Sequence, residues 1–278
     1  MPETIHILIP TFNRSNLIKE TIDSVINQSY KFWVLTIVDN NSSDNTIKML
    51  KKNYQRLINQ KKIIIQTHDN FVIQADNWSR CISYIGDYKY FKLLGSDDML
   101  DKNFLFIAIN TLEKTDDAIA GFTSGIRYID EKNNQIGRRT YGFFGFELLI
   151  SIFYRNYLGT PSSQLLKTKF FKNSKFYDIP YTTDIDFMIT SCYAKEKKLV
   201  FNKELLADFR IWPESHTNKS YGSSFMIEGR YKCRDKMIKI IFKQTFYLHF
   251  LLLVSKMIRV IEYGYFLCLE KLKAYLKV

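Results

Sequence analysis

Short runs of hydrophobic residues alternate, in the first part of the chain, with segments in which hydrophobic residues recur every three or four positions. The runs lie at residues 5–10, 34–38, 63–66 and 88–94, and each predicts a buried strand. Between them, residues 18–26 and 47–54 place their hydrophobic side chains along one side of a helix. Strands that alternate with amphipathic helices are typical of an α/β fold with a mostly parallel sheet covered on both faces.

Capping residues suggest where these helices begin. Ser15 is expected to cap the first helix, and Asp44 or Asn45 to start the second. Four further elements are predicted downstream, namely helices at residues 75–82 and 100–112 and strands at residues 118–128 and 164–167.

The pattern changes near residue 223, where long helices are predicted. One of them carries a cationic stripe at i, i+4, i+7 and i+11, formed by Lys232, Lys236, Lys239 and Lys243. The apolar run at residues 246–254 is shorter than the roughly 20 residues that span a bilayer, so it predicts an interfacial element. A second helix is predicted from Lys256. We therefore divide the chain into an α/β domain, residues 1–222, and a basic helical appendage, residues 223–278.

Positive charge is concentrated in this appendage. The whole chain has a formal net charge of +12, and residues 223–278 hold 11 Lys and Arg against 4 Asp and Glu, a net of +7. Each basic residue near an anionic membrane contributes about 1 kcal/mol of attraction. An anionic membrane surface is therefore the expected partner, and nucleic acid is not. The alternative is that these helices pack on the first domain while their lysines face water.

Size and cysteine content narrow the cellular setting. The 278 residues can bury one substantial core. The four cysteines are scattered, which favours neither a metal knuckle nor a disulfide framework and fits a reducing compartment. The N-terminus has no charged-then-apolar leader, so a cytoplasmic location is expected.

A pair of carboxylates, Asp97 and Asp98, follows the predicted strand at residues 88–94. Ligands bind at the carboxyl ends of strands in open α/β sheets. Adjacent carboxylates repel each other unless a cation lies between them and an anionic substrate, as a divalent metal does for a diphosphate. The pair thus predicts either a metal-nucleotide site or an acidic turn that caps the helix expected near Leu100.

Two upstream strands also end in polar motifs. The first ends in Pro10-Thr11-Phe12-Asn13-Arg14, and the second in Asp39-Asn40-Asn41-Ser42-Ser43-Asp44-Asn45-Thr46. Together with the double Asp, these motifs resemble those of the family 2 inverting glycosyltransferases over roughly the first two hundred residues. The resemblance implies a glycosyltransferase A-like fold, a mostly parallel nucleotide-binding sheet, and a nucleotide-sugar donor.

The same resemblance implies roles for individual residues. Asp98 coordinates Mg²⁺ or Mn²⁺ at the diphosphate, and Asp97 contacts the ribose or assists the metal. The residues implied to bind the nucleotide sugar are Pro10, Thr11, Asn13, Asp39, Asn70, Asn77, Asp97 and Arg210. Asn70 could equally be a turn residue, Asn77 a polar helix residue, and Arg210 the partner of a carboxylate.

An acceptor hydroxyl must also lose its proton, and this needs a separate carboxylate. Asp184 is the implied general base and Asp186 its competitor, while helix capping by Asp184 is the alternative reading. His216 is a second candidate for the metal. It follows Trp212, which stands where the family's Arg-x-His-x-x-Ser loop has histidine. Two more departures are Asn40 and Thr183, where the family often has Asp and Glu.

The sequence therefore predicts a metal-dependent, inverting, hexosyl-type glycosyltransferase of bacterial surface-polysaccharide synthesis, such as O-antigen or capsule. Its acceptor is expected to be a saccharide, in particular a lipid-linked one, at the inner face of the cell membrane. One alternative is a sugar nucleotidyltransferase, which usually has a Gly-rich phosphate loop that residues 10–14 do not match. Another is a non-catalytic basic adaptor that binds membrane or nucleic acid.

Overall fold

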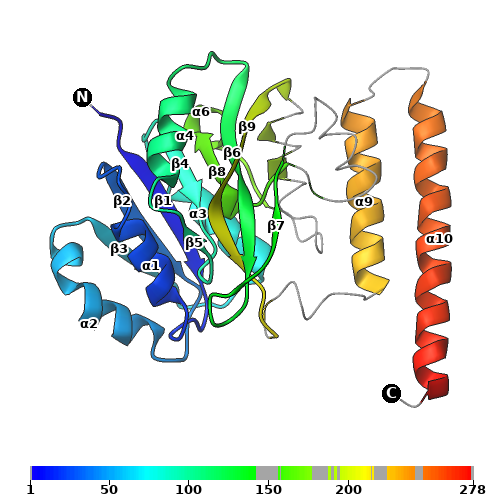
Figure 1. The fold of residues 1–278 in the computed structure, drawn as a ribbon, viewed down its shortest axis with the longest axis horizontal. Helices are drawn as coiled ribbons and strands as arrows, with labels where there is room; N and C mark the ends of the chain where they lie inside the picture. The colour runs from blue at the N-terminus through cyan, green and yellow to red at the C-terminus, as the bar shows by residue number, and fades with distance from the viewer. Residues whose placement is uncertain are drawn as a thin grey trace.

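One sheet organises the α/β part of the molecule. The computed structural model describes residues 2–141, 156, 158–176, 187–188, 191–192, 195–213, 215, 224–241 and 247–276. In these ranges the strand order is β3-β2-β1-β4-β8-β6-β9-β5, with β7 paired to β6 (Figure 1). The strands are β1 (Ile5–Thr11), β2 (Trp33–Asp39), β3 (Ile63–Thr67), β4 (Tyr90–Leu93), β5 (Met99–Leu100), β6 (Ile119–Ile129), β7 (Gln135–Arg139), β8 (Gln164–Lys167) and β9 (Lys198–Arg210).

The half of the sheet that carries the predicted motifs is parallel. β3, β2, β1 and β4 are neighbours, and all three pairings among them are parallel. In the other half, β8 runs antiparallel to β4 and β6, and β5 antiparallel to β9. The predicted α/β class is confirmed, and the parallel half brings three polar strand ends to one edge.

Helices cover both faces of the sheet (Figure 1). They are α1 (Ile18–Ile26), α2 (Thr46–Asn59), α3 (Gln74–Ser83), α4 (Phe104–Leu112), the short η1 (Pro161–Ser163) and α6 (Thr168–Phe171). One core cluster joins α1, α2 and α4 to β1 through Ile5, Ile7 and Ile9. The second joins α3 and α6 to the other face through Leu8 and Phe91. This alternation follows from the two-residue repeat of a strand.

Two predicted helix starts differ from the structure. Ser15 does not cap α1, because the N-cap position is Leu17 and the Ser15 N–H donates to Asp44 Oδ2 at 3.2 Å. The helix expected from Leu100 begins at Phe104, since Met99 and Leu100 form β5 against β9. The predicted start of α2 is confirmed, and the Thr46 N–H donates to Asp44 Oδ1 at 2.9 Å.

Two long helices, α9 (Ser224–Ile241) and α10 (Tyr247–Leu276), form the C-terminal part. The predicted break before Lys256 is absent, because α10 is continuous through that position. Cys233, Met237 and Ile238 of α9 belong to the second core cluster, so α9 packs on the α/β part. None of the helices in the described ranges is long and apolar enough to cross a membrane.

Candidate functional site

The ends of β1, β2 and β4 meet at one edge of the sheet. Thr11 and Asp39 are register partners, and the Asn40 N–H donates to the Thr11 carbonyl at 2.9 Å. The Leu94 N–H donates to the Leu8 carbonyl at 3.0 Å, which brings the segment before the double Asp alongside β1. The three motifs recognised in the sequence therefore converge, as expected for a ligand site of an open α/β sheet.

Asn13 locks the loop after β1 to the loop after β2. Its backbone has φ +50°, and its N–H donates to Ser42 Oγ at 2.9 Å. Its side-chain oxygen accepts the N–H groups of Ser43 at 2.9 Å and Asp44 at 3.3 Å. Asn tolerates the left-handed conformation better than most residues. Asn13 thus fixes the position of the two loops at this edge of the sheet. This structural role does not require contact with a nucleotide-sugar donor.

Asn40 fastens the next loop of the edge. Its amide nitrogen donates to the Val72 carbonyl at 2.7 Å, and its oxygen accepts the Val72 N–H at 2.9 Å. Arg80 adds hydrogen bonds to Asn40 Oδ1 at 3.0 Å and to the Asn70 carbonyl at 3.2 Å. An aspartate could not donate to Val72. Asn40, which stands where the family often has Asp, therefore has a structural role that an aspartate could not fill.

Some of the residues predicted to bind the nucleotide sugar are exposed in this region, and others are buried. Asn70 is exposed at the rim, whereas Asn77 is buried under β2 and its amide lies 3.5 Å from the Val38 carbonyl. Asp39 is buried and accepts the Ser42 N–H at 3.0 Å. Pro10 is buried inside β1, and Thr11 ends that strand with a buried hydroxyl that has no hydrogen-bond partner in the described chain.

Two exposed aromatic rings flank this edge, although sequence reasoning had not singled them out. Phe12 follows β1, Phe71 lies in the loop after β3, and their ring centroids are 4.8 Å apart. They are 37% and 57% exposed, which is unusual for phenylalanine. An exposed aromatic pair of this kind offers a stacking surface for a planar ring.

The two adjacent aspartates face different environments. Asp98 is 4% exposed, and both of its carboxylate oxygens accept hydrogen bonds, Oδ1 from the Arg210 N–H at 3.0 Å and Oδ2 from the Ser162 hydroxyl. Burial, followed by the charge of Asp97, raises the pKa of Asp98 to about 7. The side chain of Asp97 is 21% exposed. Asp97 is therefore the more accessible carboxylate of the pair.

Lys92 and Gly95 support the inward position of Asp98. Lys92 Nζ is buried and donates to the carbonyls of Ser162 and Gln164, at 2.5 and 3.1 Å, so it holds η1 against β4. A Cβ atom at Gly95 would lie 2.7 Å from Asp98 Oδ2. The glycine leaves room for this carboxylate, and a larger residue would displace it.

Asp97 is contacted by two side chains that sequence reasoning did not place in the site. The Trp212 indole N–H donates to Asp97 Oδ2 at 3.0 Å, and Arg14 Nε lies 3.8 Å from the same oxygen. The Arg14 guanidinium carbon is 5.0 Å from the centroid of the Trp212 ring. The unusual tryptophan at the family's histidine position was the available signal for this cluster.

Arg210 is a buried structural residue in this arrangement. Its guanidinium forms an ion pair with Glu20 at 2.6 Å and donates to the carbonyls of Asp97 and Asp130 at 2.9 and 3.0 Å. Its side chain is fully buried. Of the two roles considered for Arg210, pairing with a carboxylate is the one observed, so we do not carry it forward as a donor contact.

Three predicted residues lie outside the described ranges, namely Asp184, Asp186 and His216. Within those ranges no group of three or more His, Cys, Asp and Glu could hold a metal. This is compatible with Mg²⁺ or Mn²⁺, which binds through one or two protein carboxylates when substrate phosphates supply further ligands. Asp97 Oδ1, which accepts no hydrogen bond in the described chain, fits that limited donor set.

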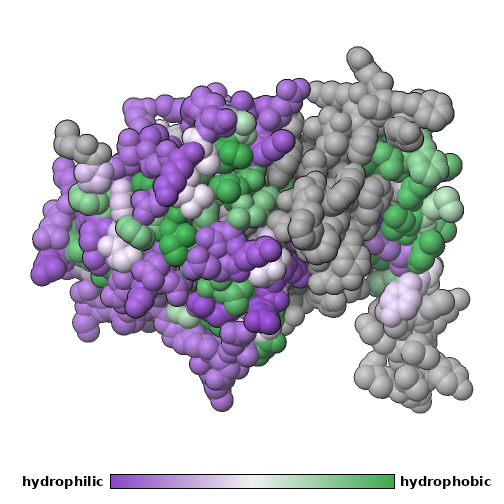
Figure 2. Space-filling view, turned by 45° about the horizontal axis from the view of Figure 1, so that its top comes forward, coloured by the Kyte–Doolittle hydropathy of each residue, from purple (hydrophilic) through white to green (hydrophobic). Residues whose placement is uncertain are grey.

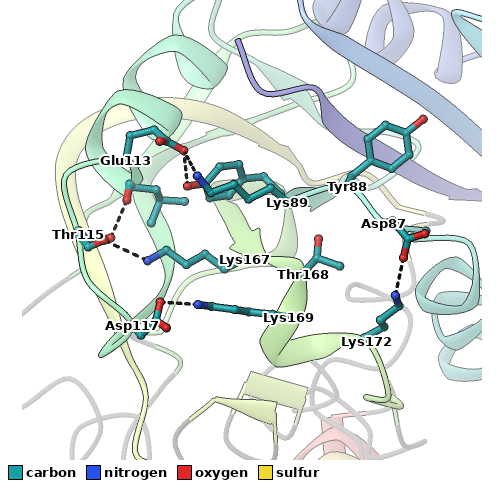
Figure 3. A pocket seen from close by; sticks show the side chains of 13 residues that line it. Asp87, Tyr88, Lys89, Glu113, Thr115, Asp117, Lys167, Thr168, Lys169 and Lys172 are labelled. Atoms are coloured by element: carbon teal, nitrogen blue, oxygen red, sulfur yellow. Dashed lines mark hydrogen bonds and ion pairs between the residues drawn. The ribbon is translucent and has the colours of Figure 1, made fainter. Parts of the chain in front are cut away.

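A cavity of about 440 Å³ lies at the opposite side of the sheet, at the amino-terminal end of β4 and the carboxyl-terminal end of β8 (Figure 3). Its cationic side chains are already paired, Lys89 with Glu113 at 2.9 Å and Lys172 with Asp87 at 2.7 Å. Lys167 donates to the Asp116 carbonyl at 2.7 Å. The cavity is remote from the three converging motifs, so we do not include it in the candidate site.

Comparison with known proteins agrees with this geometry. A family model described as Glycosyl transferase family 2 matches residues 6–175. An uncharacterized glycosyltransferase of Methanocaldococcus jannaschii is 25% identical over 214 residues, 74% of this chain and 70% of that protein. The UDP-Glc:alpha-D-GlcNAc-diphosphoundecaprenol beta-1,3-glucosyltransferase WfgD of Escherichia coli is 27% identical over 135 residues, 48% of this chain and 49% of that protein.

Solved structures share the fold. S. aureus TarS in complex with UDP-GlcNAc superposes with a TM-score of 0.68 at 15% identity, covering 90% of this chain and 70% of that one. The mannosyltransferase PcManGT from Pyrobaculum calidifontis, in complex with GDP-Man and Mn²⁺, gives a TM-score of 0.58 at 11% identity, covering 99% and 81%. At these identities the likeness concerns the fold alone.

Proposed function

The chain belongs to glycosyltransferase family 2, and from that membership we propose that it moves a sugar from a nucleotide-sugar donor to a saccharide acceptor. The observation that carries the proposal is the convergence of the β1, β2 and β4 ends, which brings Thr11 and Asp39 to the same edge as Asp97. The donor would lie across this edge, with its diphosphate near Asp97.

The nucleoside half of the donor would lie over β1 and β2. The exposed rings of Phe12 and Phe71 offer a stacking surface for the base, and each stacked base is worth about 1–3 kcal/mol in other proteins. The unpartnered Thr11 hydroxyl is a hydrogen-bonding group that a ligand could satisfy. Asp39 is placed to accept a hydrogen bond from the base or the ribose.

We propose that Asp97, rather than Asp98, is the main protein ligand of Mg²⁺ or Mn²⁺. Asp97 is the accessible carboxylate, whereas both oxygens of Asp98 are taken by Ser162 and Arg210. The bound ion would supply positive charge against the leaving diphosphate. Asp98 would then position the turn that presents Asp97. His216 remains a second candidate ligand on the basis of the sequence.

An inverting reaction also needs a base on the acceptor side. We retain Asp184 in this role, with Asp186 as its competitor, because both belong to the motif that the sequence shares with the family. The carboxylate would accept the proton of the acceptor hydroxyl as that oxygen attacks the anomeric carbon. Attack from the face opposite the diphosphate inverts the configuration of that carbon.

Product analysis tests this proposal against a sugar nucleotidyltransferase. With Mn²⁺ and a suitable acceptor, the proposed enzyme converts a nucleotide sugar to nucleoside diphosphate and a glycoside of inverted anomeric configuration. A nucleotidyltransferase would instead release pyrophosphate from a nucleoside triphosphate and a sugar 1-phosphate. Pyrophosphate release would overturn the proposal, and activity of neither kind would favour the non-catalytic adaptor.

Replacing Asp184 is expected to slow transfer without weakening donor binding. Asp184→Asn keeps the shape of the side chain but cannot accept a proton, so initial rates should fall by about 10²- to 10⁴-fold. Asp186→Asn is the matched control. The sequence predicts a helix start here, and side chains two positions apart on a helix are expected to point in different directions, so the effect of Asp186→Asn should be smaller. If Asp186→Asn is the slower enzyme, or if Asp184→Asn weakens binding of nucleoside diphosphate as much as transfer, the assignment of the base is wrong.

The outer side of α10 suggests where a membrane would contact the protein. Five of its exposed apolar side chains recur at i, i+3, i+7, i+10 and i+17, namely Phe250, Leu253, Met257, Val260 and Leu267. Figure 2 shows hydrophobic side chains gathered over this part of the molecule. The same pair of helices carries exposed lysines, Lys256 on α10 and Lys232 and Lys239 on α9. We name these five apolar residues the α10 stripe.

We propose that the α10 stripe, together with these lysines, binds the anionic inner face of a cell membrane. A narrow apolar stripe flanked by cations is typical of an interfacial helix. This location suits an enzyme of surface-polysaccharide synthesis that uses a lipid-linked acceptor, of the kind that the name of WfgD describes for that protein. The sequence expectation already placed an interfacial element at residues 246–254, and the proposal extends the apolar contact along α10 to Leu267.

Charging the stripe is expected to reduce binding to anionic liposomes. Val260 is 72% exposed, so Val260→Glu should leave the fold intact and lower the liposome partition coefficient about tenfold. Ile136→Glu is the matched control, because Ile136 is 56% exposed on β7, which lies on the other side of α9 from α10 in Figure 1. Binding of the unmodified chain should weaken with salt. Equal binding by Val260→Glu, or a dimer that Val260→Glu dissociates, would contradict the membrane proposal.

A further inference from the structure

The position of Arg14 is determined by its neighbours on three sides. Its backbone N–H donates to Thr46 Oγ1 at 2.9 Å, and its Nη1 donates to the carbonyls of Phe12 and Asn13 at 3.3 and 3.2 Å. Its guanidinium carbon lies 5.0 Å from the Trp212 ring centroid. These contacts hold the cation at the strand-end edge, beside Asp97.

One donor of this cation has no hydrogen-bond partner. Arg14 Nε is buried, and no hydrogen bond in the described chain reaches it, although Asp97 Oδ2 is 3.8 Å away. Buried polar groups are nearly always hydrogen-bonded in native proteins. A ligand oxygen that approaches Arg14 beside Asp97 would satisfy this N–H.

Other cations near the edge are already committed. Arg210 is buried against Glu20 and backbone carbonyls. Lys92 donates to carbonyls of the 161–164 segment, and Arg80 donates to Asn40 and Asn70. Within the described part of the chain, Arg14 is thus the cation beside Asp97 that retains an unpartnered donor.

We propose that Arg14 binds the diphosphate of the donor and that Trp212 is the positioning residue that holds its guanidinium there. This inference rests on the proposed glycosyltransferase function. When the bond between the anomeric carbon and the diphosphate oxygen breaks, its electron pair goes to that oxygen. The planar guanidinium, which suits phosphate oxygens, stabilises the charge that develops.

Trp212 stands where the family has histidine, but its side chain has different chemistry. An indole nitrogen carries a hydrogen and has no lone pair for a metal, so Trp212 can donate to Asp97 but cannot be a ligand. The face of its ring attracts a cation. One side chain thereby orients both Asp97 and Arg14, and the two form a paired anion and cation beside the diphosphate position.

The test is calorimetric titration with a series of ligands that differ only in phosphate number. Uridine, UMP and UDP, and the matching guanosine series, are titrated into the full chain without metal and again with Mn²⁺. Arg14→Gln should weaken binding of the preferred diphosphate about 10- to 100-fold and leave nucleoside binding unchanged. Arg14→Lys should recover part of the loss, because it keeps the charge without the planar fork.

Two further variants complete the design. Trp212→Phe retains a ring but no N–H and should weaken diphosphate binding about 3-fold, less than Arg14→Gln. Lys62→Gln is the matched control, because Lys62 Nζ lies 4.2 Å from the Trp33 ring centroid, at the other end of β2. Urea unfolding of each variant confirms that the fold is retained.

Several results would overturn the inference. Equal loss of nucleoside and diphosphate affinity in Arg14→Gln would show a structural role, and an unchanged diphosphate affinity would show no role. A third contradicting result is that Arg14→Gln binds Mn²⁺ more tightly while the ratio of its affinities for nucleoside diphosphate and nucleoside stays unchanged. That result would show that Arg14 only balances the charge of Asp97. Failure of the unmodified chain to bind any of the six ligands would instead contradict the proposed function itself.

Discussion

Asp97→Asn is expected to reduce sugar transfer about 10³-fold, because a divalent ion contributes several kcal/mol to a transition state of this kind. The side chain of Asp97 is partly exposed, and an asparagine can still accept the Trp212 N–H. The free energy of unfolding should therefore change by less than about 0.5 kcal/mol. Initial rates with Mn²⁺, beside urea unfolding, measure both quantities.

Asp98→Asn is the matched control, since it makes the same chemical change one residue away. Asp98 accepts from both Ser162 and the Arg210 backbone while buried, so this variant should lose about 1–3 kcal/mol of stability. If Asp98→Asn is inactive but fully stable while Asp97→Asn remains active, the metal ligand is Asp98, as the sequence alone suggested.

Arg210→Met is expected to lower the free energy of unfolding by about 2–5 kcal/mol, because the carbonyls of Asp97 and Asp130 each lose a donor at a cost of about 1–3 kcal/mol, whereas Glu20 is 41% exposed and can be solvated by water. The guanidinium connects β9 to Glu20 of α1 and to carbonyls of the double-Asp turn and the β6–β7 hairpin. Those carbonyls would lose a buried donor. Urea unfolding monitored by circular dichroism gives the value.

Lys19→Gln provides the matched control for Arg210. Lys19 pairs with Asp23 on the same helix at 2.5 Å, but the lysine side chain is 58% exposed. Exposed pairs contribute about 0–1 kcal/mol, so its loss should be small. If Arg210→Met is as stable as Lys19→Gln, the buried network does not hold the double-Asp turn in place.

The parallel half of the fold was predictable because each of its strands and helices has a clear hydrophobic pattern in its own stretch of sequence. Each strand from β1 to β4 is a short apolar run, and α1 to α3 repeat their hydrophobic residues with a helical period. Parallel strands joined by such helices necessarily place their carboxyl ends on one edge. The positions of Thr11, Asp39 and the double Asp follow from that rule.

The orientation of the two aspartates was not predictable, because it depends on residues far away in the sequence. Asp98 is held inward by Ser162, 64 residues later, and by Arg210, 112 residues later. Arg14 and Trp212 likewise meet only through the fold. Local patterns report which residues reach the sheet edge, but long-range packing decides which of them face a ligand.

The same reasoning explains the error at Leu100 and why the sequence could not decide which helix of the appendage packs on the first domain. Met99 and Leu100 have no strand signal of their own and become β5 only because β9 lies beside them. The hydrophobic side of α9 is buried in the second core cluster, whereas α10 leaves its stripe exposed. Amphipathic periodicity reveals an apolar side without revealing what covers it.

Release of nucleoside diphosphate from a panel of nucleotide sugars, with Mn²⁺ present, tests the central claim most directly. The unmodified chain, Asp97→Asn and Asp98→Asn are assayed side by side. The account predicts that the unmodified chain releases nucleoside diphosphate from at least one donor, and that Asp97→Asn loses this activity while remaining folded. Absence of release from every donor by the unmodified chain, or equal release by Asp97→Asn, would contradict a donor site built around Asp97.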